Sequence, residues 1–137
     1  MKKGLRLSLR PGERIFINGA VLRVDRKVSI ELLNDAAFLL EGHVMQIENA
    51  VTDLKKLYFI IQSLLIDPLR STETYDALDK IMPALKTETG NDIIRAGLVE
   101  IESYIAEGKP FEALRVLRGL FVFEVPGHSS TLASNDA

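Results

Sequence analysis

The spacing of apolar residues changes once along the chain, near Gly42, and this change constrains the fold more than any other feature. Before Gly42, apolar and polar residues alternate, as they do in strands with one buried face. After it, apolar residues recur every three or four positions, as they do on the buried side of a helix. A chain of 137 residues is long enough to bury a substantial core. We therefore expect an α+β protein in which a small sheet precedes a bundle of helices.

The alternating segment predicts about five short strands. Leu5, Leu7 and Leu9 alternate with polar residues, and similar runs cover residues 14–18, 20–25, 28–33 and 36–41. Asn18 and Gly19 predict a tight hairpin because both tolerate the positive φ of a type I′ turn. Strands joined by tight turns form an antiparallel β-meander or a small open barrel. We assign residues 1–46 to this part of the chain and call it the β-lobe.

The second segment predicts a bundle of about four helices. The first three helices each follow a residue that can cap a helix; the caps are Thr52, Ser71 and Asn91. Pro110 suits the first turn of the fourth helix. Pro83 should kink or shorten the second helix, and Gly108 should end the third in a left-handed conformation. We call residues 47–125 the helical lobe.

The end of the chain has weaker patterns. Residues 120–125 fit either the end of the last helix or a strand. Residues 126–137 are small, polar and aperiodic, so we expect a disordered tail.

Charge is divided unevenly along the chain. Residues 1–27 carry eight basic and two acidic side chains, a net charge of +6, whereas the rest of the chain has a net charge of −8. A basic segment on an acidic body favours an anionic partner for that segment, and nucleic acid is the first candidate. The alternative is an ordinary solvated strand face. The basic side chains are Lys2, Lys3, Arg6, Arg10, Arg14, Arg23, Arg26 and Lys27.

Strand geometry predicts that several of these cations share one exposed face. Burying the leucines of the first strand sends Arg6 and Arg10 to the opposite side. Arginine suits RNA because its planar group pairs with phosphate and stacks on bases. Phe16, between Arg14 and Asn18, could be a stacking platform for single-stranded RNA. Alternatively, Phe16 packs beneath the helical lobe.

Catalysis and cofactor binding find little support in the sequence. There is no cysteine, and the two histidines, His43 and His128, form no recognisable catalytic or metal-binding arrangement. No glycine-rich phosphate-binding loop is present. We therefore expect no enzyme activity, no cofactor and no metal site.

Export and membrane insertion are not expected either. Arg6 and Arg10 interrupt the apolar core that a signal peptide would need. The longest uncharged apolar run, residues 57–66, is too short to span a bilayer. We expect a cytoplasmic protein that does not bind membranes.

The last predicted helix is apolar on nearly all sides. Such a helix either contacts a partner protein or lies at the centre of the core. We assign to partner binding Leu117, Leu120, Phe121 and Phe123.

Three sequence blocks also carry a family resemblance. They are GLRLSLRPGERIFINGAVLRV at residues 4–24, LYFIIQSLLIDP at residues 57–68 and GKPFEALRVLRGLFVFE at residues 108–124. In this order they resemble the FlbT family, flagellin biosynthesis regulators of flagellated alphaproteobacteria. The resemblance implies post-transcriptional repression of flagellin synthesis by binding of the 5′ leader of flagellin mRNA. It also implies the small protein FlaF as a functional partner.

A shorter likeness concerns the mode of RNA binding. The spacing Arg10-x-Gly12-Glu13-x-Ile15-x-Ile17-x-Gly19 is similar to the opening of the CsrA carbon storage regulators, small all-β proteins that hold messenger leaders between paired strands. A shared mode would place Arg6, Arg10 and Arg14 beside the RNA and would imply a homodimer formed through the β-lobe.

A second function class stays open beside the RNA-binding one. In it, the protein is an interaction adaptor or a secretion-associated chaperone that contacts FlaF or flagellin through its helices. Its effect on mRNA would then be indirect.

Overall fold

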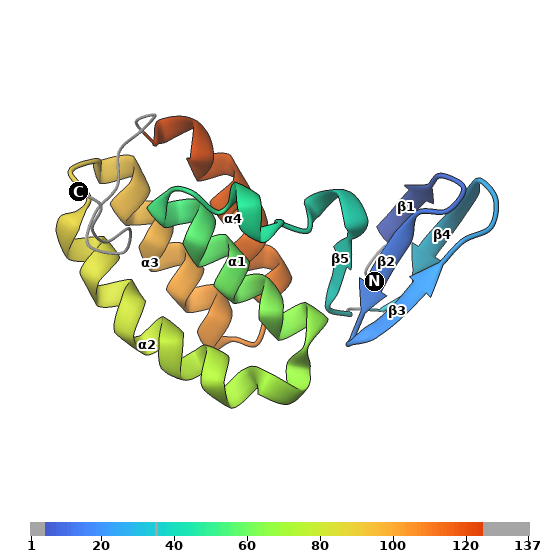
Figure 1. Ribbon diagram of the computed structural model, residues 1–137, viewed down its shortest axis with the longest axis horizontal. Helices are drawn as coiled ribbons and strands as arrows, with labels where there is room; N and C mark the ends of the chain where they lie inside the picture. The colour runs from blue at the N-terminus through green and yellow to red at the C-terminus, as the bar shows by residue number, and fades with distance from the viewer. Residues whose placement is uncertain (1–4, 35, 125–137) are drawn as a thin grey trace.

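Strands occupy the first third of the molecule and helices the rest, which confirms the α+β class (Figure 1). The computed structural model describes residues 5–34 and 36–124. The strands are β1 (Leu5–Leu9), β2 (Arg14–Ile17), β3 (Ala20–Arg23), β4 (Val28–Leu32) and β5 (Phe38–Leu40). The α-helices are α1 (Asp53–Ile66), α2 (Ser71–Glu88), α3 (Asp92–Ala106) and α4 (Pro110–Leu120).

Short 3-10 helices connect these elements, so the described residues hold more helical segments than the roughly four expected. They are η1 (Glu41–His43), η2 (Ile47–Asn49), η3 (Pro68–Arg70) and η4 (Phe121–Phe123). The last of them decides the ambiguous end of the helical lobe, which is a 3-10 turn and not a strand. The predicted tail lies outside the described residues.

The five strands form two small antiparallel sheets. β1 pairs with β4, while β2 lies between β3 and β5. Asn18 and Gly19 have φ values of 49° and 86°, which confirms the tight turn between β2 and β3. The predicted meander is wrong because β1 pairs with β4 and not with its neighbour in sequence, and the described strands close no barrel. Alternation predicts which face of a strand is buried, but it does not select the partner strand.

The central strand β2 is buried on both faces. Phe16 on one face belongs, with Leu39 of β5, to the main core formed with the helices. Ile15 on the other face is buried outside that core, as is Leu9 of β1. The β3-β2-β5 sheet therefore lies against the helices on one face and forms a second, smaller core on the other.

The helix boundaries agree with the predicted caps except at one position. The Thr52 hydroxyl accepts a hydrogen bond from the Lys55 backbone N–H, and the Asn91 side chain accepts from Ile93 and Ile94. Ser71, however, is the first residue of α2 and does not cap it.

Two further helix predictions had different outcomes. Gly108 follows α3 with φ 74°, as predicted. The helix α2 continues through Pro83 to Glu88, so this proline does not shorten it.

Gly19 of the β-lobe lies very close to Pro68 of the helical lobe. Its φ is 86°, and a Cβ atom there would lie 2.9 Å from Cγ of Pro68 in η3. Gly12 has a similar φ of 81° but faces open space. We expect Gly12→Ala to lower the free energy of unfolding by about 1–2 kcal/mol, because the backbone is left-handed. Gly19→Ala should cost at least about 1 kcal/mol more, because the new methyl group meets Pro68. Urea unfolding of both variants measures the difference, and equal losses would contradict the close approach.

Candidate nucleic-acid interface

The β1–β4 sheet separates apolar from polar side chains as alternation predicts. Leu5, Leu7 and Leu9 share one face, and Arg6 lies on the other, opposite Glu31 of β4. The Arg6 guanidinium is 3.5 Å from the Glu31 carboxylate, and 69% of the Arg6 side chain is exposed. The prediction that Arg6 points away from the leucine face is therefore confirmed.

Arg14 and Arg23 lie directly opposite each other on β2 and β3. Like charges at paired strand positions repel each other, and Glu41 of η1 offsets this repulsion. Its carboxylate accepts hydrogen bonds from the Arg14 backbone N–H at 2.8 Å and from Nη2 of Arg14 at 3.3 Å. Arg23 makes no ion pair with any described residue. The sequence offered no local signal for Glu41, because it lies 27 positions from Arg14.

Glu41 gives this arrangement a pH dependence. Hydrogen bonds from the backbone and side chain of Arg14, aided by the charge of Arg23, lower the pKa of the Glu41 carboxyl. A lowered pKa in the folded state stabilises the protein above the unfolded-state pKa, and this contribution is lost as pH falls through the folded-state value. We expect wild-type protein to melt at a higher temperature than Glu41→Gln near pH 6, and the difference to shrink steadily below pH 4.5. Melting curves at several pH values measure it, and a constant difference would contradict the assignment.

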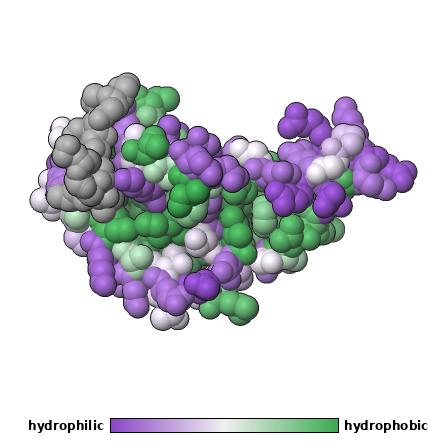
Figure 2. All heavy atoms as spheres, viewed as in Figure 1, coloured by the Kyte–Doolittle hydropathy of each residue, from purple (hydrophilic) through white to green (hydrophobic). Residues whose placement is uncertain are grey.

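Three further cations lie in the connections at the end of the β-lobe farthest from the helices (Figure 1). Arg10 follows β1, and Arg26 and Lys27 precede β4. Arg10 lies 3.9 Å from Glu13 and Arg26 lies 3.1 Å from Asp25, while Lys27 makes no ion pair with a described residue. Figure 2 shows hydrophilic side chains gathered at this end of the molecule. Lys2 and Lys3 lie outside the described residues.

The prediction that Phe16 is an RNA-stacking platform is wrong. Only 8% of Phe16 is exposed, and its ring belongs to the main core. The cause is the packing of α1 against β2 and β5, which covers the face that carries Phe16. The alternative, packing beneath the helical lobe, is confirmed.

The net charge differs in sign between the two parts of the described chain. Residues 5–34 carry six basic and three acidic side chains, a net charge of +3, whereas residues 36–124 have a net charge of −5. Four of the six cations face a carboxylate. Exposed ion pairs of this kind contribute only about 0–1 kcal/mol each. A phosphate group, which pairs well with arginine, can therefore take the place of the carboxylates.

The assigned partner surface on α4 needs a correction. Leu117 and Leu120 are 0% and 6% exposed and belong to the main core, because α4 packs against both α1 and α3. Phe121 is half-buried, and its ring lies 5.7 Å from that of Tyr58. The exposed apolar side chains are those of η4, with Val122 82% and Phe123 40% exposed. The sequence pattern missed Val122 because it does not show where the helix stops.

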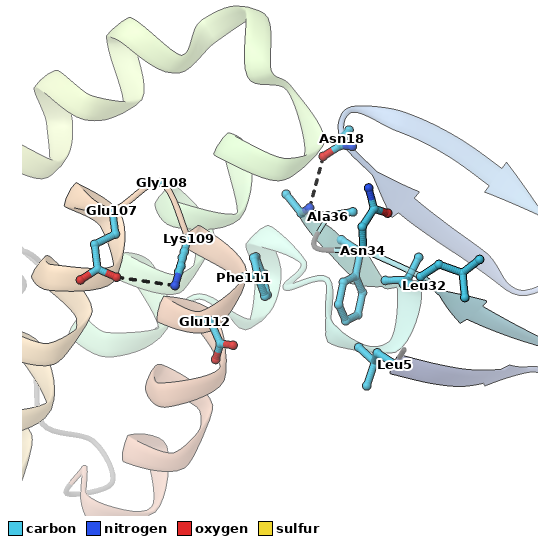
Figure 3. A pocket seen from close by; sticks show the side chains of 13 residues that line it. Leu5, Asn18, Leu32, Asn34, Ala36, Glu107, Gly108, Lys109, Phe111 and Glu112 are labelled. Atoms are coloured by element: carbon cyan, nitrogen blue, oxygen red, sulfur yellow. Dashed lines mark hydrogen bonds and ion pairs between the residues drawn. The ribbon is translucent and has the colours of Figure 1, made fainter. Parts of the chain in front are cut away.

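An open cleft of about 560 Å³ lies between the β-lobe and the start of α4 (Figure 3). The rings of Phe38 and Phe111 lie 5.8 Å apart at this boundary. The cation in its lining, Lys109, is 3.8 Å from the carboxylate of Glu107 (Figure 3). Glu112 also lines the cleft, so its lining carries no excess positive charge that would favour a phosphate.

The described residues also bear on metal binding and on insertion into a membrane. Within residues 5–34 and 36–124, no three histidine, cysteine, aspartate or glutamate side chains lie close enough to hold a metal ion. None of the described helices is long and apolar enough to cross a membrane.

Known proteins provide an independent comparison. The family described as "Flagellar protein FlbT" matches residues 5–126. A protein of Agrobacterium fabrum (strain C58), named a probable flagellum biosynthesis repressor protein FlbT, is 50% identical over 124 residues, which cover 90% of this chain and 83% of the relative. A Rhizobium etli (strain CIAT 652) protein of the same name has the same identity and coverage. A Mesorhizobium japonicum relative is 43% identical over 124 residues, or 90% of this chain and 84% of its own. No solved structure matches the chain.

Proposed function

The chain belongs to the FlbT family, and from this premise we propose that it represses flagellin synthesis in the cytoplasm by binding the 5′ leader of flagellin mRNA. The relatives' names support a role as repressor in flagellum biosynthesis. The choice of mRNA as the target rests on the chemistry of the β-lobe.

The observation that carries this proposal is the pairing of Arg14 with Arg23 on neighbouring strands. A protein gains no stability from two guanidinium groups at directly opposed positions. Two such groups do suit a nucleic-acid backbone, because each can pair with one phosphate. Among the described residues Arg14 pairs with Glu41 and Arg23 makes no ion pair, so part of their charge is uncompensated. The net charge of +3 over residues 5–34 extends the attraction for an anionic chain.

Titration of the purified full-length protein with RNA tests the proposal. One RNA is a flagellin leader, and the other is a scrambled leader of the same length and composition. We expect tighter binding to the true leader, and a log Kd that increases by about 0.7 per phosphate contact for each tenfold increase in salt. Absence of binding to either RNA at low salt would overturn the proposal.

The exposed apolar residues of η4 favour a second candidate function, that of an adaptor. Phe123 also lines a mostly apolar cavity of about 350 Å³ with Leu54, Leu85 and Ile94. Large apolar side chains exposed beside such a cavity are typical of a protein-binding surface. We propose FlaF as the protein that contacts η4, with flagellin as the other candidate.

The β-lobe also has a surface suited to a second copy of the chain. All four residues of β3 are exposed, including Val21 and Leu22, and β3 is an edge strand. Exposed apolar edge strands pair readily with other strands. We propose a homodimer formed through β3, which would have twice the 15.3 kDa mass of the chain. Light scattering measures that mass, and a monomer at micromolar concentration would contradict the dimer.

A further inference from the structure

An arginine of the helical lobe is held in place without an ion pair. Arg118, in the last turn of α4, donates from Nη1 to the Tyr58 hydroxyl at 2.8 Å. The Tyr58 hydroxyl in turn donates to the backbone oxygen of His43 at 2.6 Å. Burial raises the pKa of the Tyr58 phenol, although Arg118 opposes this, so the phenol keeps the proton that it donates. Arg118 is half-buried and faces no carboxylate among the described residues.

A second cation and an aromatic ring lie beside this arginine. The Phe121 ring is tilted by 55° against that of Tyr58, with the ring centres 5.7 Å apart, and Nζ of Lys55 lies 5.8 Å from the centre of the Phe121 ring. Lys55 makes no ion pair with a described residue. The nearby Glu124 carboxylate is already engaged, because it accepts hydrogen bonds from Thr52 and from the Leu54 backbone N–H. We call Lys55, Tyr58, Arg118 and Phe121 the α1–α4 cluster.

Most other cations of the helical lobe are neutralised, which sets this cluster apart. Five of them form ion pairs at 4 Å or less; they are Arg70, Lys86, Arg95, Lys109 and Arg115. Lys55 and Arg118, by contrast, make no ion pair with a described residue; Lys55 lies over the Phe121 ring, and Arg118 donates to the hydroxyl of the neighbouring Tyr58. This combination suits single-stranded nucleic acid, in which phosphates pair with cations and bases stack on rings.

The cluster is also connected to the basic strands. The short helix η1 contacts β2 through Glu41 and contacts Tyr58 through the His43 backbone oxygen. Burial and the charge of Arg118 lower the pKa of the His43 imidazole, which disfavours its positively charged form between the two sites. The short helix η1, whose Glu41 carboxylate is engaged by Arg14, thus joins the basic strands to the cluster.

We infer that the α1–α4 cluster is a second contact for the same RNA, with phosphates on Lys55 and Arg118 and a base on Phe121. This inference rests on the proposed function, and it adds an RNA contact on the helical lobe, although the net charge of residues 36–124 is −5. It also explains why Arg118 is positioned by a phenol, since that leaves its remaining N–H donors available to a ligand.

The test compares full-length variants in their binding to flagellin leader RNA over a series of salt concentrations. Lys55→Gln combined with Arg118→Gln should lower the slope of log Kd against log salt by about 1.4, because two phosphate contacts are lost. Phe121→Leu should weaken binding about fivefold or more with an unchanged slope, because it removes a stacked base. Lys80→Gln, which removes an exposed cation on α2, should change neither quantity. Melting curves identify any variant that does not fold. If the double variant is one of them, Lys55→Gln alone, which removes the cation over the Phe121 ring, serves in its place.

Inorganic polyphosphate as a second probe separates phosphate contacts from base contacts. The double variant should lose polyphosphate affinity, whereas Phe121→Leu should bind polyphosphate like wild type. An equal effect of Phe121→Leu on both probes would overturn the base contact. Wild-type leader affinity and slope in the double variant would overturn the inference, and so would loss of FlaF binding without loss of RNA binding. If wild-type protein itself does not bind the leader, the proposed function fails first.

Discussion

Replacing Arg6, Arg10 and Arg14 together by glutamine is expected to weaken leader RNA binding by about 1,000-fold or more while the protein stays folded. Each substitution removes one charge-assisted contact, and such contacts contribute about 1.5–3 kcal/mol each. The net charge of residues 5–34 falls from +3 to zero, and the salt slope should fall by about 2. Binding at several salt concentrations measures both effects.

Glutamine is preferable to glutamate in this experiment. Each of the three arginines faces a carboxylate, from Glu31, Glu13 and Glu41. Glutamate would place like charges side by side and lower stability through repulsion.

A matched control removes three cations from the helical lobe, by glutamine substitution of Arg70, Lys80 and Arg115. It causes the same change in total charge, so an equal loss of RNA affinity would show that overall charge, and not the β-lobe, determines binding.

The second prediction with a large expected effect compares a core residue of α4 with the exposed residues of η4. Leu117→Ala should lower the free energy of unfolding by about 2–5 kcal/mol, because Leu117 is fully buried. Phe123→Ser combined with Val122→Ser should cost less stability, because both side chains are exposed, Val122 by 82% and Phe123 by 40%. The same double variant should lose binding to FlaF. Urea unfolding and co-elution with FlaF measure the two properties.

Leu69→Ser is the control for exposed apolar surface in general, because Leu69 is exposed but lies in η3. A Val122/Phe123 double variant that retains FlaF affinity would contradict the placement of the partner site on η4.

Local patterns in the sequence were sufficient for most of the secondary structure. Asn18-Gly19 predicts its turn, and Thr52 and Asn91 predict their helix starts, because each acts through its own backbone neighbourhood. Ser71 shows the limit of such patterns, since the preceding η3 lets α2 begin at the serine itself.

Features that depend on distant contacts were not predictable in this way. Phe16 has polar neighbours on its own face of the strand, yet it is buried, because α1 packs against this face of β2 and β5. Glu41 meets Arg14 across 27 positions, and Arg118 meets Tyr58 across 60. The sequence therefore predicted that the β-lobe is basic, but not which carboxylates neutralise it or which helical cations remain free of them.

Amide chemical shifts of the isotope-labelled full-length protein during titration with leader RNA test the central claim most directly, and a chain of 15.3 kDa suits the method. If the β-lobe binds RNA, the largest shifts will fall on the residues around Arg6, Arg14 and Arg23, and the exposed face of α2 will not respond. Shifts confined to the helices, with residues 5–34 unchanged at saturating RNA, would contradict it.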